Sequence, residues 1–143
     1  MANSLVAFMA QNAVKAEVID VAISKRFLDV DGKPVKWKLG AITSDEDESL
    51  RKSCTYKTQV TGKKDQFTMD FDNNRYVGVL AAKCVVYPDL NDAGLQDSYS
   101  VKSGDSLLKT MLLPGEYAKL VERVQEINGY DRSMDEVVEE AKN

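Results

Sequence analysis

The strongest folding constraint in this chain is residues 107–131, which read LLKTMLLPGEYAKLVERVQEINGYD. Apolar side chains recur there three and four positions apart, as on one face of an α-helix: Leu113, Tyr117, Leu120, Val121, Val124 and Ile127. Pro114 suits the first turn of such a helix, and Gly129 suits the position just beyond its end. The pattern therefore predicts a long amphipathic helix whose apolar face either completes the core or binds another protein.

An earlier part of the chain has the alternating pattern of β-strands. In residues 17–43 the apolar side chains fall at every second position on either side of a turn at Asp29 to Gly32: Ile19, Val21 and Ile23 before it, and Val35, Trp37, Leu39 and Ala41 after it. This predicts a β-hairpin with one buried face. Residues 55–70 surround the sequence TGKKD and predict either a second hairpin or a flexible loop.

Helix signals occupy most of the remaining chain. Thr43 and Ser44, followed by four carboxylates, predict a helix over residues 44–54. In residues 71–143 we expect a helix from Asp72 or Asn73 to the Tyr87-Pro88 stop, a short helix after Asn91, one from Ser103 or Asp105 to just before Pro114, the long helix, and a last one after Ser133.

Residues 1–16 contain a short helical pattern from Ser4 to Ala13, and mobility of this segment is left open. Strand signals followed by helix signals, without βαβ alternation, predict an α+β fold in which N-terminal antiparallel hairpins pack with a C-terminal set of helices. At 143 residues we expect a single domain.

Composition excludes several classes of protein. A net charge of -4 is unsuited to holding nucleic acid, and the lysines near Trp37 and at the second turn fit solvated strand faces. No apolar run is long enough to span a membrane, and the start is a poor signal peptide, so we expect residence in the cytoplasm. Cys54 and Cys84 lack metal-site spacing and fit reduced core thiols.

Reactive chemistry is also missing. The chain has no histidine, which removes the usual general base and the commonest metal ligand. Asp70 and Asp29 each begin a stretch resembling a calcium loop, but both stretches lack required ligands. Trp37 alternates with apolar neighbours, which favours a core position over a ligand-stacking platform. We therefore expect no enzyme activity, no cofactor and no metal.

Three blocks of sequence carry a resemblance to a known family: KWKLGAITSDEDESLRKSC, YVGVLAAKCVVYPDLNDAGLQDSY, and the long-helix segment together with the ending VVEEAKN. They resemble the XkdN-like tail assembly chaperones of contractile-tailed phages and prophages of Gram-positive bacteria. The similarity extends from about Val18 to the C-terminus, and its most specific strings are YPDLNDAxLQDSY and LLPGEYxxL.

The resemblance implies a non-enzymatic factor that binds the tape-measure protein, helps recruit tail tube subunits and leaves before the tail is finished. We then expect it in the cytoplasm of the bacterial host and not in the mature virion. Many such phages also make a longer, frameshifted form, and this chain would correspond to the short one. Whether the protein associates with itself is left open.

A partner site is predicted at the helix junction before and after Pro114, because methionine and exposed apolar residues suit the binding of amphipathic helices. The candidate residues are Leu108, Met111, Leu112, Leu113 and Tyr117. The simpler interpretation is that these residues close the core. The hairpin or loop at residues 55–70 offers a second surface, for which a solvated hairpin is again the simpler interpretation.

Two rival functions follow from the same sequence. One is a permanent tail subunit of the terminator or connector type, which would form rings and remain in purified particles. The other is a small enzyme or metal-binding regulator, which a buried cluster of perturbed carboxylates would favour. The missing histidine and incomplete calcium loops weigh against the second rival.

Overall fold

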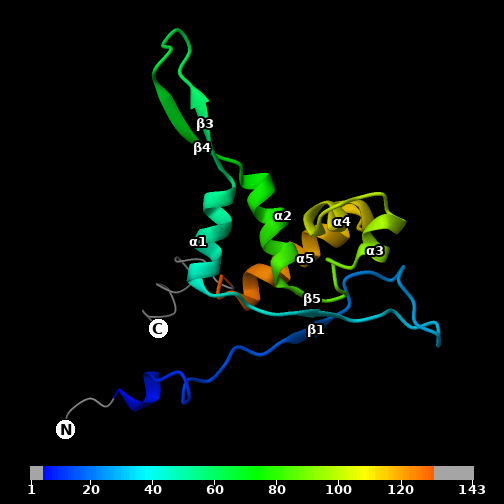
Figure 1. Ribbon diagram of the computed structural model, residues 1–143. Helices are drawn as coiled ribbons and strands as arrows, with labels where there is room; N and C mark the ends of the chain where they lie inside the picture. Colours follow the sequence, from blue (N-terminus) through cyan, green and yellow to red (C-terminus); the bar gives the residue numbers. More distant parts are fainter. Residues whose placement is uncertain (1–4, 131–143) are drawn as a thin grey trace, which may run out of the picture.

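The computed structural model describes residues 5–130, arranged as a small sheet and a group of helices with one long hairpin projecting from them (Figure 1). The elements in chain order are a 3-10 turn at Val6–Phe8, β1 Ile19–Val21, β2 Trp37–Leu39, α1 Ser44–Ser53, β3 Thr55–Gln59, β4 Phe67–Phe71, α2 Asn73–Cys84, β5 Val85–Tyr87, α3 Ala93–Ser98, α4 Gly104–Met111 and α5 Pro114–Ile127. Both sheets are antiparallel, so the predicted α+β class is confirmed.

The first predicted hairpin forms one side of a three-stranded sheet in the order β1-β2-β5. Ile19 pairs with Leu39 and Val21 with Trp37; Trp37 and Leu39 are buried, whereas Lys33, Lys36 and Lys38 are exposed. The turn at Asp29 is closed by a backbone bond from Gly32, which has a positive φ of 76°. The predicted hairpin and its solvated lysine face are both confirmed.

Strand β5 corrects a sequence prediction. We expected the helix after Asp72 to include Val85 and to stop at Tyr87-Pro88, but it ends at Cys84 and the chain continues as a strand. Val85 pairs with Leu39, and Gly40 donates its backbone N–H to the Cys84 carbonyl. β-Branched residues suit both a buried helix face and a strand, so pairing with β2 decides between them.

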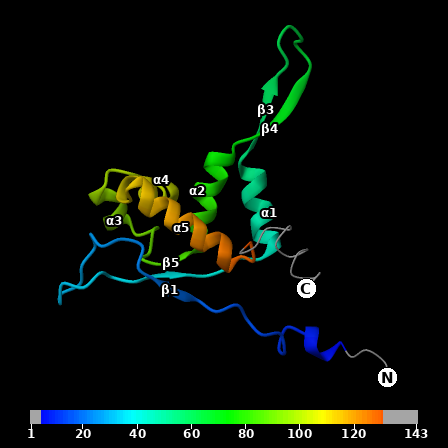
Figure 2. The same cartoon turned by 180° about the vertical axis from the view of Figure 1, so that it is seen from behind.

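Helix α1 begins with the predicted cap. The Thr43 side chain accepts a hydrogen bond from the Glu46 backbone N–H, and the Thr43 backbone N–H donates one to the Glu46 carboxylate. Helix α2 begins at the Asp72 cap, and its Tyr76 hydroxyl donates to Asp47 of α1. The Tyr76–Asp47 bond links α1 to α2, and the two helices lie side by side in both opposite views (Figure 2).

The N-terminal segment differs from its prediction. Instead of a helix from Ser4 to Ala13, the described part has only a 3-10 turn at Val6–Phe8, with Leu5 and Phe8 exposed. A short helix without a surface to pack against is only marginally stable, so the apolar spacing alone did not produce one. Ser4 and the helix expected after Ser133 lie outside the described residues.

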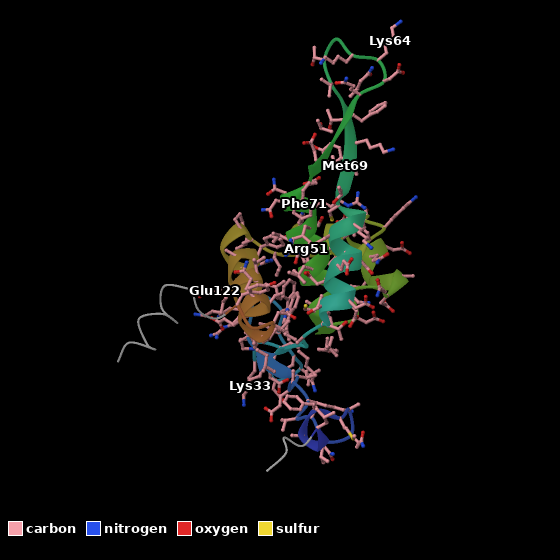
Figure 3. The ribbon with its side chains drawn as sticks, turned by 90° about the vertical axis from the view of Figure 1, so that its left-hand side faces the viewer. Lys33, Arg51, Lys64, Met69, Phe71 and Glu122 are labelled. Carbon is pink, nitrogen blue, oxygen red and sulfur yellow. The ribbon has the colours of Figure 1, made fainter. Side chains whose placement is uncertain are left out.

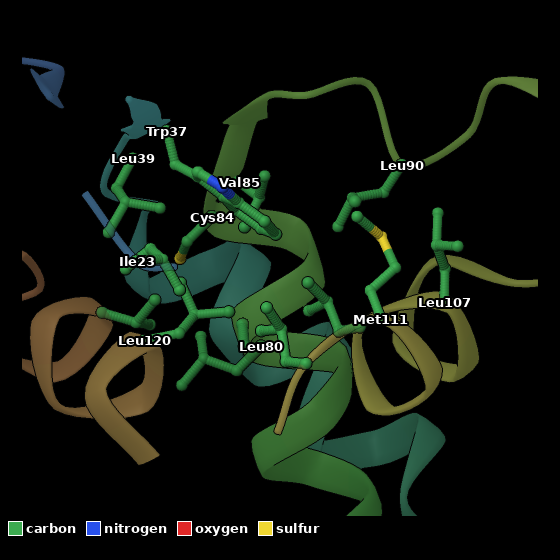
Figure 4. Packing of buried hydrophobic residues seen from close by; sticks show 14 of the residues in the cluster. Ile23, Trp37, Leu39, Leu80, Cys84, Val85, Leu90, Leu107, Met111 and Leu120 are labelled. Carbon is green, nitrogen blue, oxygen red and sulfur yellow. The ribbon is translucent and has the colours of Figure 1, made fainter. Parts of the chain in front are cut away.

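The core lies between the sheet and helices α2, α4 and α5 (Figure 4). Sixteen apolar residues are buried in the described part: Ile23, Trp37, Leu39, Cys54, Tyr76, Leu80, Ala81, Cys84, Val85, Leu90, Leu107, Leu108, Met111, Leu112, Leu120 and Val124. Both cysteines are free thiols, and burial raises the pKa of Cys84. Trp37 and the thiols are therefore core residues, as predicted.

Candidate partner-binding site

The junction between α4 and α5 is the site predicted from sequence. Met111 ends α4, Leu112 and Leu113 take extended backbone conformations, and Pro114 begins α5. An extended residue before proline avoids the steric clash that α geometry would cause. The two helices therefore meet at a bend formed by these residues.

The five candidate residues differ in burial. Leu108, Met111 and Leu112 are buried at 0%, 6% and 7% exposure, whereas Leu113 is 55% exposed. Tyr117 is half-buried, and its hydroxyl has no hydrogen-bond partner among the described residues. Of these residues, Leu113 therefore supplies most of the accessible apolar surface. Contact of Leu108 and Leu112 with a partner stays a prediction.

A shallow apolar hollow lies on one side of this junction and has a volume of about 190 Å³. Its walls come from four parts of the chain: Phe27, Val35 and Trp37 of the first hairpin, Tyr87 and Pro88 after α2, Leu95 of α3, and Met111 of α4. The centroids of the Phe27 and Trp37 rings lie 6.4 Å apart. All the residues that line the hollow are apolar or aromatic, so it presents no acidic, basic or nucleophilic side chain.

Charged groups close to the hollow are paired with each other. The Arg26 guanidinium binds the Glu116 carboxylate at 2.6 Å and the Met111 carbonyl at 2.7 Å, and it lies 5.1 Å from the centre of the Phe27 ring. Arg26, the Ser24 hydroxyl and the Leu113 backbone N–H lower the pKa of Glu116 to about 2. This network ties the first hairpin to α5 beside the hollow that Phe27 and Met111 both line.

The described residues contain no arrangement that suggests catalysis. No three of their histidine, cysteine, aspartate or glutamate side chains are grouped to hold a metal ion. Within residues 5–130, the carboxyl groups with displaced pKa values are Glu46, Asp47 and Glu116, and all three pKa values are lowered. A general acid near neutral pH needs the opposite displacement.

None of the helices between residues 5 and 130 is long and apolar enough to cross a membrane.

Comparison with known proteins decides the family. Residues 5–142 match the family described as phage XkdN-like tail assembly chaperone protein. The chain belongs to the phage XkdN-like tail assembly chaperone family. Its role is therefore in phage tail assembly, as the resemblance implied.

Individual relatives agree with this assignment. The chain is 33% identical over 137 residues to the phage-like element PBSX protein XkdN of Bacillus subtilis strain 168, covering 95% of this chain and 91% of that protein. It is 32% identical over the same length to YqbN of that strain. The crystal structure of YqbN has a TM-score of 0.77, with 30% identity, 92% of this chain and all of that chain covered. This tail assembly chaperone thus resembles XkdN in sequence and YqbN in both sequence and fold.

Sequence reasoning located only part of the hollow of this chaperone. Met111 was a candidate, whereas Phe27, Tyr87 and Leu95 were not. Tyr87 and Pro88 were interpreted as a helix stop, although their position after an apolar run was the available signal. The structure brings them to Met111 because β5 pairs with β2.

Proposed function

We propose that this tail assembly chaperone binds the tape-measure protein of its phage and helps recruit tail tube subunits. It does so in the cytoplasm of the bacterial host and leaves before the tail is complete. The observation that carries the proposal is the apolar hollow beside Met111, in a chain whose family acts in tail assembly.

The size of the hollow supports a protein partner. Ligand pockets commonly have volumes of roughly 300–1,000 Å³ and enclose their ligand with a few polar contacts. A hollow of about 190 Å³ with apolar walls is smaller and accepts one or two apolar side chains. Amphipathic helices bind by inserting such side chains into apolar grooves. A long helical tape-measure protein offers many of them.

Exposed Tyr87 lines the hollow, and exposed Leu113 lies two residues after Met111, another of its lining residues. Tyr87 is 50% exposed and lines the hollow, whereas neighbouring Val86 is 54% exposed and does not line it. Adjacent strand residues project to opposite faces. Substitution of Tyr87 therefore tests the hollow, and the same substitution of Val86 is its matched control.

The test is co-expression of the chaperone with its tape-measure protein. We expect soluble tape-measure protein to accumulate only with the chaperone, and to fall several-fold with Tyr87→Ser or Leu113→Asp but not with Val86→Ser. Circular dichroism of each purified variant checks that it is folded. Equal solubility without the chaperone would overturn the proposal.

Recruitment of tube subunits is tested separately. Purified tube protein should bind the chaperone–tape-measure complex more strongly than the tape-measure protein alone. Mass spectrometry of purified tails should find the chain absent or rare. Its presence at a fixed number of copies per particle would instead support a permanent tail subunit.

A further inference from the structure

The hairpin formed by β3 and β4 projects from the helices and is unused by the proposed function. Five residue pairs join its strands, from Thr55 opposite Phe71 to Gln59 opposite Phe67. Figures 1 and 2 show it extending beyond the ends of α1 and α2. A two-stranded hairpin is marginally stable alone, and this one has a large exposed surface.

One face of the hairpin carries an apolar stripe. Phe67, Met69 and Phe71 are alternate residues of β4 and so point to the same side. They are 57%, 62% and 41% exposed. Three large exposed apolar side chains on one face form a contiguous apolar surface, and such surfaces often bind another protein.

The charged strand residue on this face of the hairpin is basic, and the tip carries two lysines, Lys63 and Lys64, with one acid, Asp65. Lys57 lies directly opposite Met69 and therefore shares its face, whereas the strand acid Asp70 pairs with Tyr56 on the other face. Lys64 lies at the far end of the hairpin and Arg51 near its base, with Met69 and Phe71 between them (Figure 3). The Arg51 guanidinium lies 6.0 Å from the centre of the Phe71 ring.

The base of the hairpin is held firmly to the helices. Asp72 donates its backbone N–H to the Cys54 carbonyl at 2.8 Å, which closes the hairpin where α1 ends and α2 begins. The Phe71 and Tyr76 rings lie 5.5 Å apart, and Arg51 covers the Tyr76 ring at 4.4 Å. An orientation fixed at the base reduces the ordering cost of binding.

We propose that the stripe of Phe67, Met69 and Phe71 docks an amphipathic helix of a partner protein whose apolar residues are flanked by carboxylates. The apolar stripe contacts the apolar residues of that helix, and Lys57 and the tip lysines face its acidic flanks. This surface is separate from the hollow, because α2 places them at opposite ends of 12 residues, roughly 18 Å. The chaperone can thus hold two partner segments at once.

The same charges disfavour other occupants. Pairing of two hairpins through their stripes would bring the lysines of both copies together, and like charges facing each other are destabilising. Single-stranded nucleic acid also uses aromatic and basic residues, but it needs a longer basic path than one strand lysine and the tip provide. Both remain outcomes that the experiment distinguishes.

The experiment measures the binding of two synthetic helical peptides by fluorescence anisotropy. Both are about 18 residues, roughly five turns, and carry the same leucine stripe, with glutamate flanks in one and lysine flanks in the other. We expect the glutamate peptide to bind at least about tenfold more tightly, a difference of about 1.4 kcal/mol. No binding of the glutamate peptide, or equal binding of both, would overturn the proposal.

Two variants locate the binding face. Met69→Asp places a charge in the stripe and should weaken the glutamate peptide about tenfold or more, by roughly 1.4 kcal/mol. Thr58→Asp adds the same charge to the opposite face of the same hairpin and should leave the affinity nearly unchanged. Equal weakening by both variants would mean a non-specific charge effect and would refute the docking face.

The remaining controls test the two other occupants. Light scattering shows whether the wild-type protein forms dimers that Met69→Asp abolishes, which would assign the stripe to a second copy. Competition with a short single-stranded DNA shows whether nucleic acid displaces the peptide. Either result would overturn the proposal of an acidic helical partner.

Discussion

Two leucines close together in the chain, one buried and one exposed, allow a direct test of which residues of the α4–α5 segment belong to the core. Leu120 is fully buried at 0% exposure, whereas Leu113 is 55% exposed at the start of the same helix. Leu120→Ala and Leu113→Ala remove the same atoms, so any difference between them reflects their surroundings. Alanine also keeps the Leu113 backbone N–H that binds Glu116.

Removing a fully buried leucine side chain costs about 2.7–5.0 kcal/mol, because transfer free energy is lost and a cavity remains. Removing a half-exposed one leaves no closed cavity and should cost under about 1 kcal/mol. With a urea m-value of roughly 2 kcal/mol/M, we expect Leu120→Ala to lower the unfolding midpoint by roughly 1.4–2.5 M. Leu113→Ala should lower it by less than roughly 0.5 M.

The assay is urea unfolding followed by circular dichroism and by Trp37 fluorescence. Trp37 is buried in the same core as Leu120, so both signals should change together. Similar midpoints for the two variants would refute the assignment of Leu120 to the core and Leu113 to the exposed surface.

Three further measurements test other parts of the structure. The pKa of the Glu116 carboxyl is lowered from 4.5 to about 2, so its bonds with Arg26 stabilise the fold above pH 4.5 and are lost as the pH falls towards 2. Glu116→Gln should therefore destabilise the protein at neutral pH. The difference in stability between this variant and the wild type should shrink over that acid range. Thr43→Ala removes the cap of α1 and should reduce the free energy of unfolding by about 1 kcal/mol, with Thr43→Ser as the matched control. Cys54 and Cys84 are buried, so a thiol reagent should modify them only at the rate of unfolding, and fast modification of the folded protein would contradict their burial.

Local signals in the sequence were sufficient for most helices and for the first hairpin. The cap at Thr43, proline at position 114 and glycine at position 129 act within a few residues, so their effect is visible without the fold. Residues 55–70 permitted a hairpin or a loop, and the structure contains the hairpin. In this case the alternation in Phe67 and Met69 was the correct signal.

The candidate site was less predictable because its walls come from distant segments. Phe27, Tyr87 and Met111 converge only after β5 has paired with β2 and α4 has packed beside α2. Leu108, Met111 and Leu112 are all buried core residues, yet of the three only Met111 also lines the hollow. Composition alone does not separate an apolar residue that fills the interior from one that lines a hollow.

The sequence by itself determined the fold class, the helix limits at Thr43, Pro114 and Gly129, the absence of histidine chemistry, and the family resemblance that the comparisons confirmed. Only the tertiary structure decided that residues 85–87 form a strand, that Met111 borders a hollow, and that Phe67, Met69 and Phe71 form an exposed stripe. The physical reason is range: caps and turns act between neighbouring residues, whereas burial depends on which distant segments pack together.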